Sequence, residues 1–279
     1  MKIILNSCTF SNDITIGKAS FDYDKDIDNL FVNGYSLQPT DNIKNALSDF
    51  VTKLKNTNFW DKIQGIYIPL LGTTANDSFL NVRKSLGTDN VIDSYPSGAF
   101  EMDSENKGVK GTSQNLYGPN WPKNWYSDDC DLSDFHMCIV SKEYKPTKDD
   151  AHCFLGNFKI SKYNQSFIDN VCKVSYLNTI LLNETQIPVN IEKPTILCYN
   201  KDSDTIFSNT KFSTVEHVKD TEGAIKYYPF YKSIYKDIAE TQNLFGVKYY
   251  SYGKKMTEQE MKMYYNIVDN LVTSLLAEV

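Results

Sequence analysis

Residues 246–260 read GVKYYSYGKKMTEQE, a Tyr- and Val-rich run followed by the start of an amphipathic segment that continues to residue 279. Thr257 and Glu260 have the spacing of a capping box, in which the Thr hydroxyl accepts from the Glu260 amide and the Glu carboxylate accepts from the Thr257 amide. Apolar residues then recur at three- and four-residue steps, at Met261, Tyr264, Tyr265, Val268, Leu271, Val272 and Leu275. One stripe of this helix needs cover, so the sequence predicts a strand followed by a helix that docks on the rest of the fold.

A second amphipathic helix is predicted near the N-terminus. Thr40 or Asp41 can cap it, and its apolar positions are Ile43, Leu47, Phe50, Val51 and Leu54. The chain then reads NFWDKIQGIYIPLLG over residues 58–72, where residues 66–71 are predicted to form a short strand. Because both apolar stripes need cover, we expect the C-terminal helix to dock beside this helix or the strand after it.

Short apolar runs separated by turn residues occupy the middle of the chain. They cover residues 135–141, 153–160, 171–177, 194–200, 205–208, 211–215 and 245–252, while residues 232–243 fit either a helix or a strand. Residues 201–204 (KDSD) lie between two runs as a hairpin loop would. Strands without intervening amphipathic helices favour antiparallel pairing. The predicted fold is therefore mainly β, an antiparallel β-sandwich with an N-terminal helix and a C-terminal docking helix.

Composition excludes several classes of function. With 29 Lys and Arg against 35 Asp and Glu, the net charge is −6, which disfavours neutralisation of nucleic-acid phosphates. The apolar stretch near Met1 spans three residues, too short for a signal peptide, and no other run approaches the roughly 18 residues of a membrane span. We expect no membrane insertion, and we expect the protein to be made in the cytoplasm and to stay there. The six cysteines show no CxxC spacing, so buried thiols are expected rather than disulfides.

Catalytic and metal-binding motifs are sparse. The sequence holds three histidines and lacks the hydrolase elbow, the phosphate loop and the HExxH run, so no enzyme activity and no cofactor are expected. His136 and Cys138 share one face of a predicted strand, and His152 and Cys153 begin the next. If those strands paired, at most three zinc ligands could converge, and buried thiols with an ordinary His are the preferred interpretation. Residues 128–134 carry four Asp that could bind Ca²⁺, but a solvated acidic turn is the favoured interpretation.

Residues 117–126 (YGPNWPKNWY) concentrate two of the three Trp in a stretch that Gly and two Pro keep out of regular structure. Flat rings beside amides can stack on a sugar and bond its hydroxyls. The alternative is a loop that plugs one end of the sandwich or contacts a neighbouring subunit. The candidate ligand-binding residues are Tyr117, Asn120, Trp121, Asn124, Trp125 and Tyr126.

Several of these features together resemble a family of tailed-bacteriophage virion proteins. Its pattern is a short helix, a Trp-Lys pair, a Tyr-Pro strand, a Gly and an Asn-Leu step, and, after many strands, a Gly before Leu-Thr-x-x-Glu and a last helix. The matching residues are Trp60, Lys62, Tyr67, Pro69, Gly72, Asn81, Gly253, Met256, Thr257 and Glu260. Ile68 separates Tyr67 from Pro69, Met256 stands for the usual Leu, and the middle of the chain matches only in its strand rhythm.

The resemblance implies a concanavalin A-like or laminin-G-like lectin sandwich over residues 25–279, preceded by an N-terminal strand segment, residues 1–24, that could anchor it to the virion. It also implies a homo-oligomeric head or tail appendage, with other virion proteins and a host-surface glycan as partners. Two alternatives stay open: a glycan-degrading enzyme of the same architecture, and a purely structural capsid or tail component that binds no sugar.

Overall fold

The computed structural model describes two long segments, residues 25–86 and 246–279, and many strands between them. The described residues are 25–86, 100–105, 107–111, 134–142, 152–160, 166–167, 172–175, 179–182, 185–200, 203–216, 225–229 and 246–279. The segment of residues 1–24, predicted to contain strands, and residues 232–243 lie outside them.

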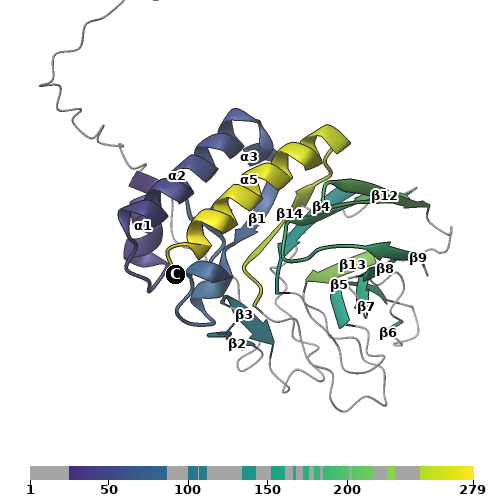
Figure 1. Ribbon diagram of the computed structural model, residues 1–279, viewed down its shortest axis with the longest axis horizontal. Helices are drawn as coiled ribbons and strands as arrows, with labels where there is room; N and C mark the ends of the chain where they lie inside the picture. Colours follow the sequence, from purple (N-terminus) through teal and green to yellow (C-terminus); the bar gives the residue numbers. More distant parts are fainter. Residues whose placement is uncertain are drawn as a thin grey trace, which may run out of the picture.

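Helices lie at both ends of the described chain. They are α1 (Lys25–Asn33), α2 (Asp41–Asn56), α3 (Phe59–Lys62), α4 (Val82–Ser85) and α5 (Glu258–Leu276), with 3₁₀ turns η1 (Pro69–Leu71) and η2 (Asp77–Phe79). Figure 1 shows α2 and α5 side by side, which agrees with their direct packing. At the far end of α5, the Glu278 carboxylate accepts from the Thr40 hydroxyl at 2.9 Å and from the Asn42 amide at 2.8 Å. The predicted docking of the C-terminal helix on the N-terminal one is confirmed.

Antiparallel sheets make up the rest. The first has the order β1 (Ile63–Tyr67), β14 (Tyr249–Lys254), β4 (Asp134–Val140), β10 (Thr195–Asn200), β11 (Ser203–Ser208) and β12 (Lys211–Glu216). The second has the order β13 (Ile225–Pro229), β5 (His152–Ile160), β7 (Cys172–Ser175), β8 (Thr179–Leu182) and β9 (Thr185–Pro188), with β6 (Ser166–Phe167) on β5. A two-stranded ribbon joins β2 (Phe100–Met102) to β3 (Val109–Gly111). Because β1 pairs with β14, segments from near the two ends of the described chain lie side by side at one edge of the first sheet.

The local helix signals act as the sequence predicts. The Thr40 hydroxyl accepts from the Ile43 amide at 3.2 Å, and the capping box of Thr257 and Glu260 is complete. Every apolar position predicted for the two helices is buried. The hairpin at residues 201–204 is also confirmed, although β11 already begins at Ser203.

The strand predicted over residues 66–71 is wrong in its second half. β1 ends at Tyr67, and Pro69 begins the 3₁₀ turn η1, closed by the Gly72 amide donating to the Pro69 carbonyl at 3.0 Å. Proline has no N–H for a strand ladder and its fixed φ suits the first position of a helical turn.

The centre of the first sheet is buried on both faces, whereas β12 at its edge is half-buried or exposed where its side chains are described. In β4, residues 136–140 are all buried, and alternate side chains of a strand point to opposite faces. We call the side beneath α2 and α5 the helix face; it carries Cys138, Val140, Ile196, Cys198 and Tyr249. The opposite side, the far face, carries Met137, Ile139, Tyr67, Tyr250 and Tyr252. The structure thus combines antiparallel sheets with packed terminal helices, and a face-to-face pair of sheets is not seen among the described residues.

Candidate functional site

The predicted carbohydrate loop lies in residues 112–133, outside the described part of the chain. Its six candidate residues, Tyr117, Asn120, Trp121, Asn124, Trp125 and Tyr126, therefore remain predictions. The Ca²⁺-type acidic stretch of residues 128–134 also remains a prediction. Of its four Asp, the structure describes Asp134 alone, at the start of β4.

By contrast, most of the residues that carry the family resemblance come together in space, whereas Pro69 and Gly72 lie apart from them, at η1. They lie where α3, β1 and α4 meet β14 and the start of α5, a region that we call the terminal junction. Its members are Trp60, Lys62, Tyr67, Asn81, Arg83, His136, Gly253, Met256, Thr257 and Glu260.

An ion pair joins the two chain ends at this junction. Lys62 Nζ lies 2.7 Å from both carboxylate oxygens of Glu260, which also accepts from the Thr257 amide at 2.8 Å. Burial by itself raises the pKa of Glu260, but the hydrogen bonds from Lys62 and Thr257 outweigh it and hold the pKa below its usual value. One carboxylate therefore both caps α5 and ties it to α3.

Gly253 allows β14 to lie close to the end of α3. A Cβ atom added there would lie 2.1 Å from the carbonyl oxygen of Lys62, well inside contact distance. The position needs glycine because the neighbouring atom belongs to the backbone and cannot rotate away.

Asn81 holds the outer edge of β1. Its side chain is fully buried, accepts from the Ile66 amide at 3.4 Å and the Lys84 amide at 3.3 Å, and donates to the Tyr67 hydroxyl at 3.3 Å. It thus caps α4 and covers backbone that would otherwise be an open sheet edge.

Trp60 has cations near its ring. The Arg83 guanidinium lies 4.4 Å from the ring centroid and its Nε donates to the Trp60 carbonyl at 3.0 Å, while Lys55 Nζ lies 5.5 Å from the centroid. Burial, partly offset by Asp61, lowers the pKa of Arg83. This Trp fixes α4 against α3, as expected for a structural residue.

His136 is fully buried on the helix face. Its Nδ1 lies 2.6 Å from the Lys254 carbonyl, which can only accept, so Nδ1 carries the proton. Its ring packs edge-on against Tyr264 at 5.7 Å between centroids, and its Nε2 has no hydrogen-bond partner among the described residues. Burial is the main cause that lowers the pKa of His136 to about 4, so the ring is neutral at pH 7.

The zinc hypothesis is not supported at this position. His136 and Cys138 share the helix face as predicted, but β4 pairs with β14 and β10, whereas His152 and Cys153 lie on β5 in the other sheet. Cys138 and Cys198 are buried thiols. Among the described residues, no group of three or more His, Cys, Asp or Glu side chains is arranged to hold a metal ion.

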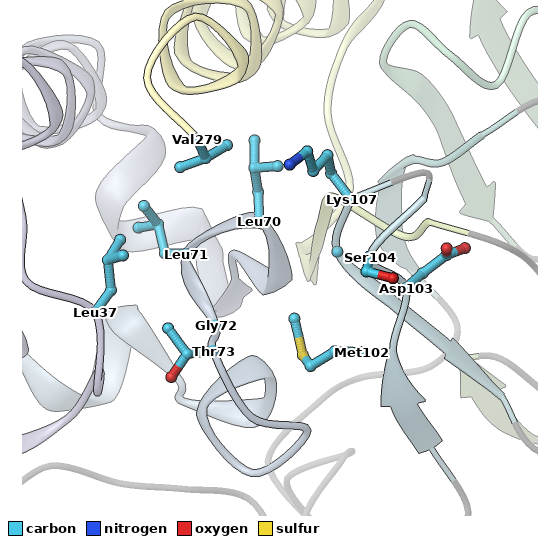
Figure 2. Close-up of a pocket in the computed structure, with 11 residues that line it drawn as sticks. Leu37, Leu70, Leu71, Gly72, Thr73, Met102, Asp103, Ser104, Lys107 and Val279 are labelled. Atoms are coloured by element: carbon cyan, nitrogen blue, oxygen red, sulfur yellow. The ribbon is translucent and has the colours of Figure 1, made fainter.

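A shallow pocket of about 240 Å³ lies at the other end of α5. Figure 2 shows Leu37, Leu70, Leu71 and Val279 on one side and residues of the β2–β3 ribbon, including Met102 and Lys107, on the other. These lining residues are far apart in the sequence, and no motif marked them in advance.

Asp77 braces the loop beside this pocket. Its carboxylate accepts from the Ser36 amide at 3.1 Å, the Thr73 amide at 3.2 Å and the Thr74 hydroxyl at 2.7 Å. Burial alone would raise the pKa of Asp77, but these hydrogen bonds outweigh burial and hold the pKa below its usual value. The carboxylate therefore stays ionised and has a structural role.

No protein-family model matches the chain, and no curated protein matches it. Within the described residues, no helix combines the length and apolar character that crossing a membrane requires.

Proposed function

We propose that this chain is a structural protein of a tailed-phage virion, a head or tail appendage that contacts the host surface. The observation that supports the proposal is the terminal junction. Residues of the family pattern that are nearly 200 positions apart, such as Lys62 and Glu260, are direct partners in space.

Each of these residues has a structural role that suits its type. Gly253 permits a close backbone approach, Asn81 caps a helix and covers a strand edge, and Glu260 completes a capping box and an ion pair. Proteins that share a fold are expected to share the residues that pack together inside it, whereas proteins that share a ligand are expected to share exposed residues that contact the ligand. The resemblance therefore supports a common architecture first and a common role through it.

The finer fold that we propose is a lectin-type jelly-roll sandwich. The buried far face supports it, because a sheet face that carries Met137, Ile139 and three buried tyrosines needs a second layer. A second antiparallel sheet, β13-β5-β7-β8-β9, is available for that role.

We propose the loop of residues 117–126 as the contact with a host glycan, without catalysis. Trp121→Ala and Trp125→Ala should each weaken binding to host cells by about 1–3 kcal/mol and leave the melting temperature nearly unchanged. Trp60→Phe is the matched control, because it alters a Trp that packs inside the terminal junction. Normal binding by both loop variants would exclude the loop, and release of oligosaccharides from host polysaccharide would assign the chain to enzymes instead.

Immunogold labelling of purified virions tests the proposed role itself. An antibody against this protein should decorate the head or tail surface at regular positions. If the protein is missing from gradient-purified particles, the proposal is wrong. If natural particles contain the protein, but particles that lack it bind host cells equally well, the purely structural alternative is correct.

A further inference from the structure

The start of α5 covers a buried histidine whose surroundings would neither solvate nor pair a positive charge. His136 is fully buried, its Nδ1–H is committed to the Lys254 carbonyl, and a second proton would have to go to Nε2. Since Nε2 has no acceptor nearby among the described residues, the charged ring would be neither solvated nor paired.

The neighbours of His136 do not favour its charged form enough to compensate. From the elements packed around it, the charged or titratable groups are Lys62 of α3, Glu260 and Tyr264 of α5, Cys138 of β4 and Cys198 of β10. Lys62 repels a cation on the ring and Glu260 attracts it, but these two are already paired with each other at 2.7 Å. Tyr264 bonds Tyr249 at 2.6 Å and Ser251 at 2.8 Å, so its hydroxyl is also committed.

We propose that α5 is an acid-sensitive latch, released from the helix face when His136 and Glu260 take up protons. Release exposes His136 to water and separates Lys62 from Glu260. Because α5 follows β14 and belongs to no sheet, its release breaks no strand pairing.

The direction of the pH effect follows from proton binding in the two states. With α5 docked, the pKa of His136 is about 4, and with α5 released it returns toward 6.5. Below pH 6.5 the released state therefore binds more protons, and the ratio of docked to released protein should fall by about sixfold per pH unit down to about pH 4.5 and then level off near pH 4. The pKa of Glu260 is lowered in the docked state, so its protonation acts in the same direction at lower pH.

Cys138 reports the release, because it is buried in the core beneath α5 and should become reactive only when α5 leaves. The probe is 4,4′-dithiodipyridine, with modification of Cys138 mapped by mass spectrometry and divided by its rate in the urea-unfolded protein at the same pH. The normalised rate should rise about sixfold per pH unit between 6.5 and 4.5. The double variant H152Q/H217Q should show the same rise, because it leaves His136 as the sole histidine.

The variant His136→Gln should lose most of the rise, since a Gln amide can still donate to Lys254 and takes up no proton. A rate that does not change with pH in the natural protein, or an unchanged rise in His136→Gln, would overturn the proposal. If His136→Gln does not fold, hydrogen exchange of the natural protein decides the question. Protection of the α5 amides from exchange should fall toward pH 4.5 more than protection of the β11 and β12 amides. An equal loss of protection in all three would mean global unfolding and no latch.

Discussion

The two faces of the first sheet are buried in different ways. The helix face is covered by segments from both ends of the chain and contains a polar group of His136, Ser251 and Tyr264 among aliphatic side chains. The far face is rich in tyrosine, and the rings of Tyr67 and Tyr250 stack at 5.8 Å. Figure 1 shows the helices over one side of this sheet.

The difference shows how one strand serves two environments. In β4, His136 and Cys138 point to the helix face, while Met137 and Ile139 point to the far face. On the helix face, His136 and the nearby Glu260 have pKa values shifted by the packing of α5. Stability linked to that face should therefore depend on pH between 4 and 7, whereas stability linked to the far face should not.

Removing the cover of the helix face should have the largest effect. Deletion of residues 257–279 exposes the apolar positions of α2 and the sheet residues beneath α5. We expect an insoluble or molten protein that keeps its strand pairing, as the latch requires, but loses fixed side-chain packing, measured by loss of near-ultraviolet circular dichroism and by dye binding. A truncated protein with an unchanged cooperative melt would show that the helix face does not need α5.

Gly253→Ala should destabilise the terminal junction by about 1–3 kcal/mol or more, because its Cβ would lie 2.1 Å from the Lys62 carbonyl oxygen. The measurement is urea unfolding followed by circular dichroism. Ser274→Ala, on the exposed side of α5, is the control and should change stability by less than about 0.5 kcal/mol. Equal stability of the two variants would contradict the close approach of β14 to α3.

Tyr67→Phe tests the far face. It removes the hydroxyl that accepts from Asn81 at 3.3 Å, so we expect a loss of about 1 kcal/mol. The loss should be the same at pH 7 and pH 5 in urea unfolding, since the bond joins a hydroxyl to an amide and involves no carboxylate or imidazole. A pH-dependent loss would remove the distinction between the two faces.

Lys62→Met should have the smallest effect, about 0.5 kcal/mol at pH 7, because the pair with Glu260 is partly exposed and screened. The folded pKa of Glu260 lies below its unfolded value of 4.5. The contribution is therefore complete above that value and disappears as the pH falls through the folded pKa. Urea unfolding at pH 7 and pH 3 checks this, and an effect that grows in acid would contradict the pairing.

The local features of the fold could be predicted from the sequence. The caps at Thr40 and Thr257, the two apolar stripes and the hairpin after β10 depend on residues within a few positions of one another. Such signals need no knowledge of the rest of the chain.

Apart from the docking of α5 on α2, which the two apolar stripes predict, long-range features could not be predicted. The pairing of β1 with β14 joins residues such as Tyr67 and Tyr250, and no local pattern specifies it. Periodicity placed His136 and Cys138 on one face but could not show that α5 covers them or that β5 belongs to another sheet. The candidate loop of residues 117–126 remains a prediction for its position and its ligand.

We propose that the first sheet is the middle layer of a virion appendage, with terminal helices on one face and a second sheet on the other. Electron cryo-microscopy of purified virions at a resolution that separates strands tests it most directly. The account predicts density on the head or tail surface in which α2 and α5 lie on one face of a sheet and a second sheet packs on its far face. Particles that lack this density, or a far face covered by helices, would contradict it.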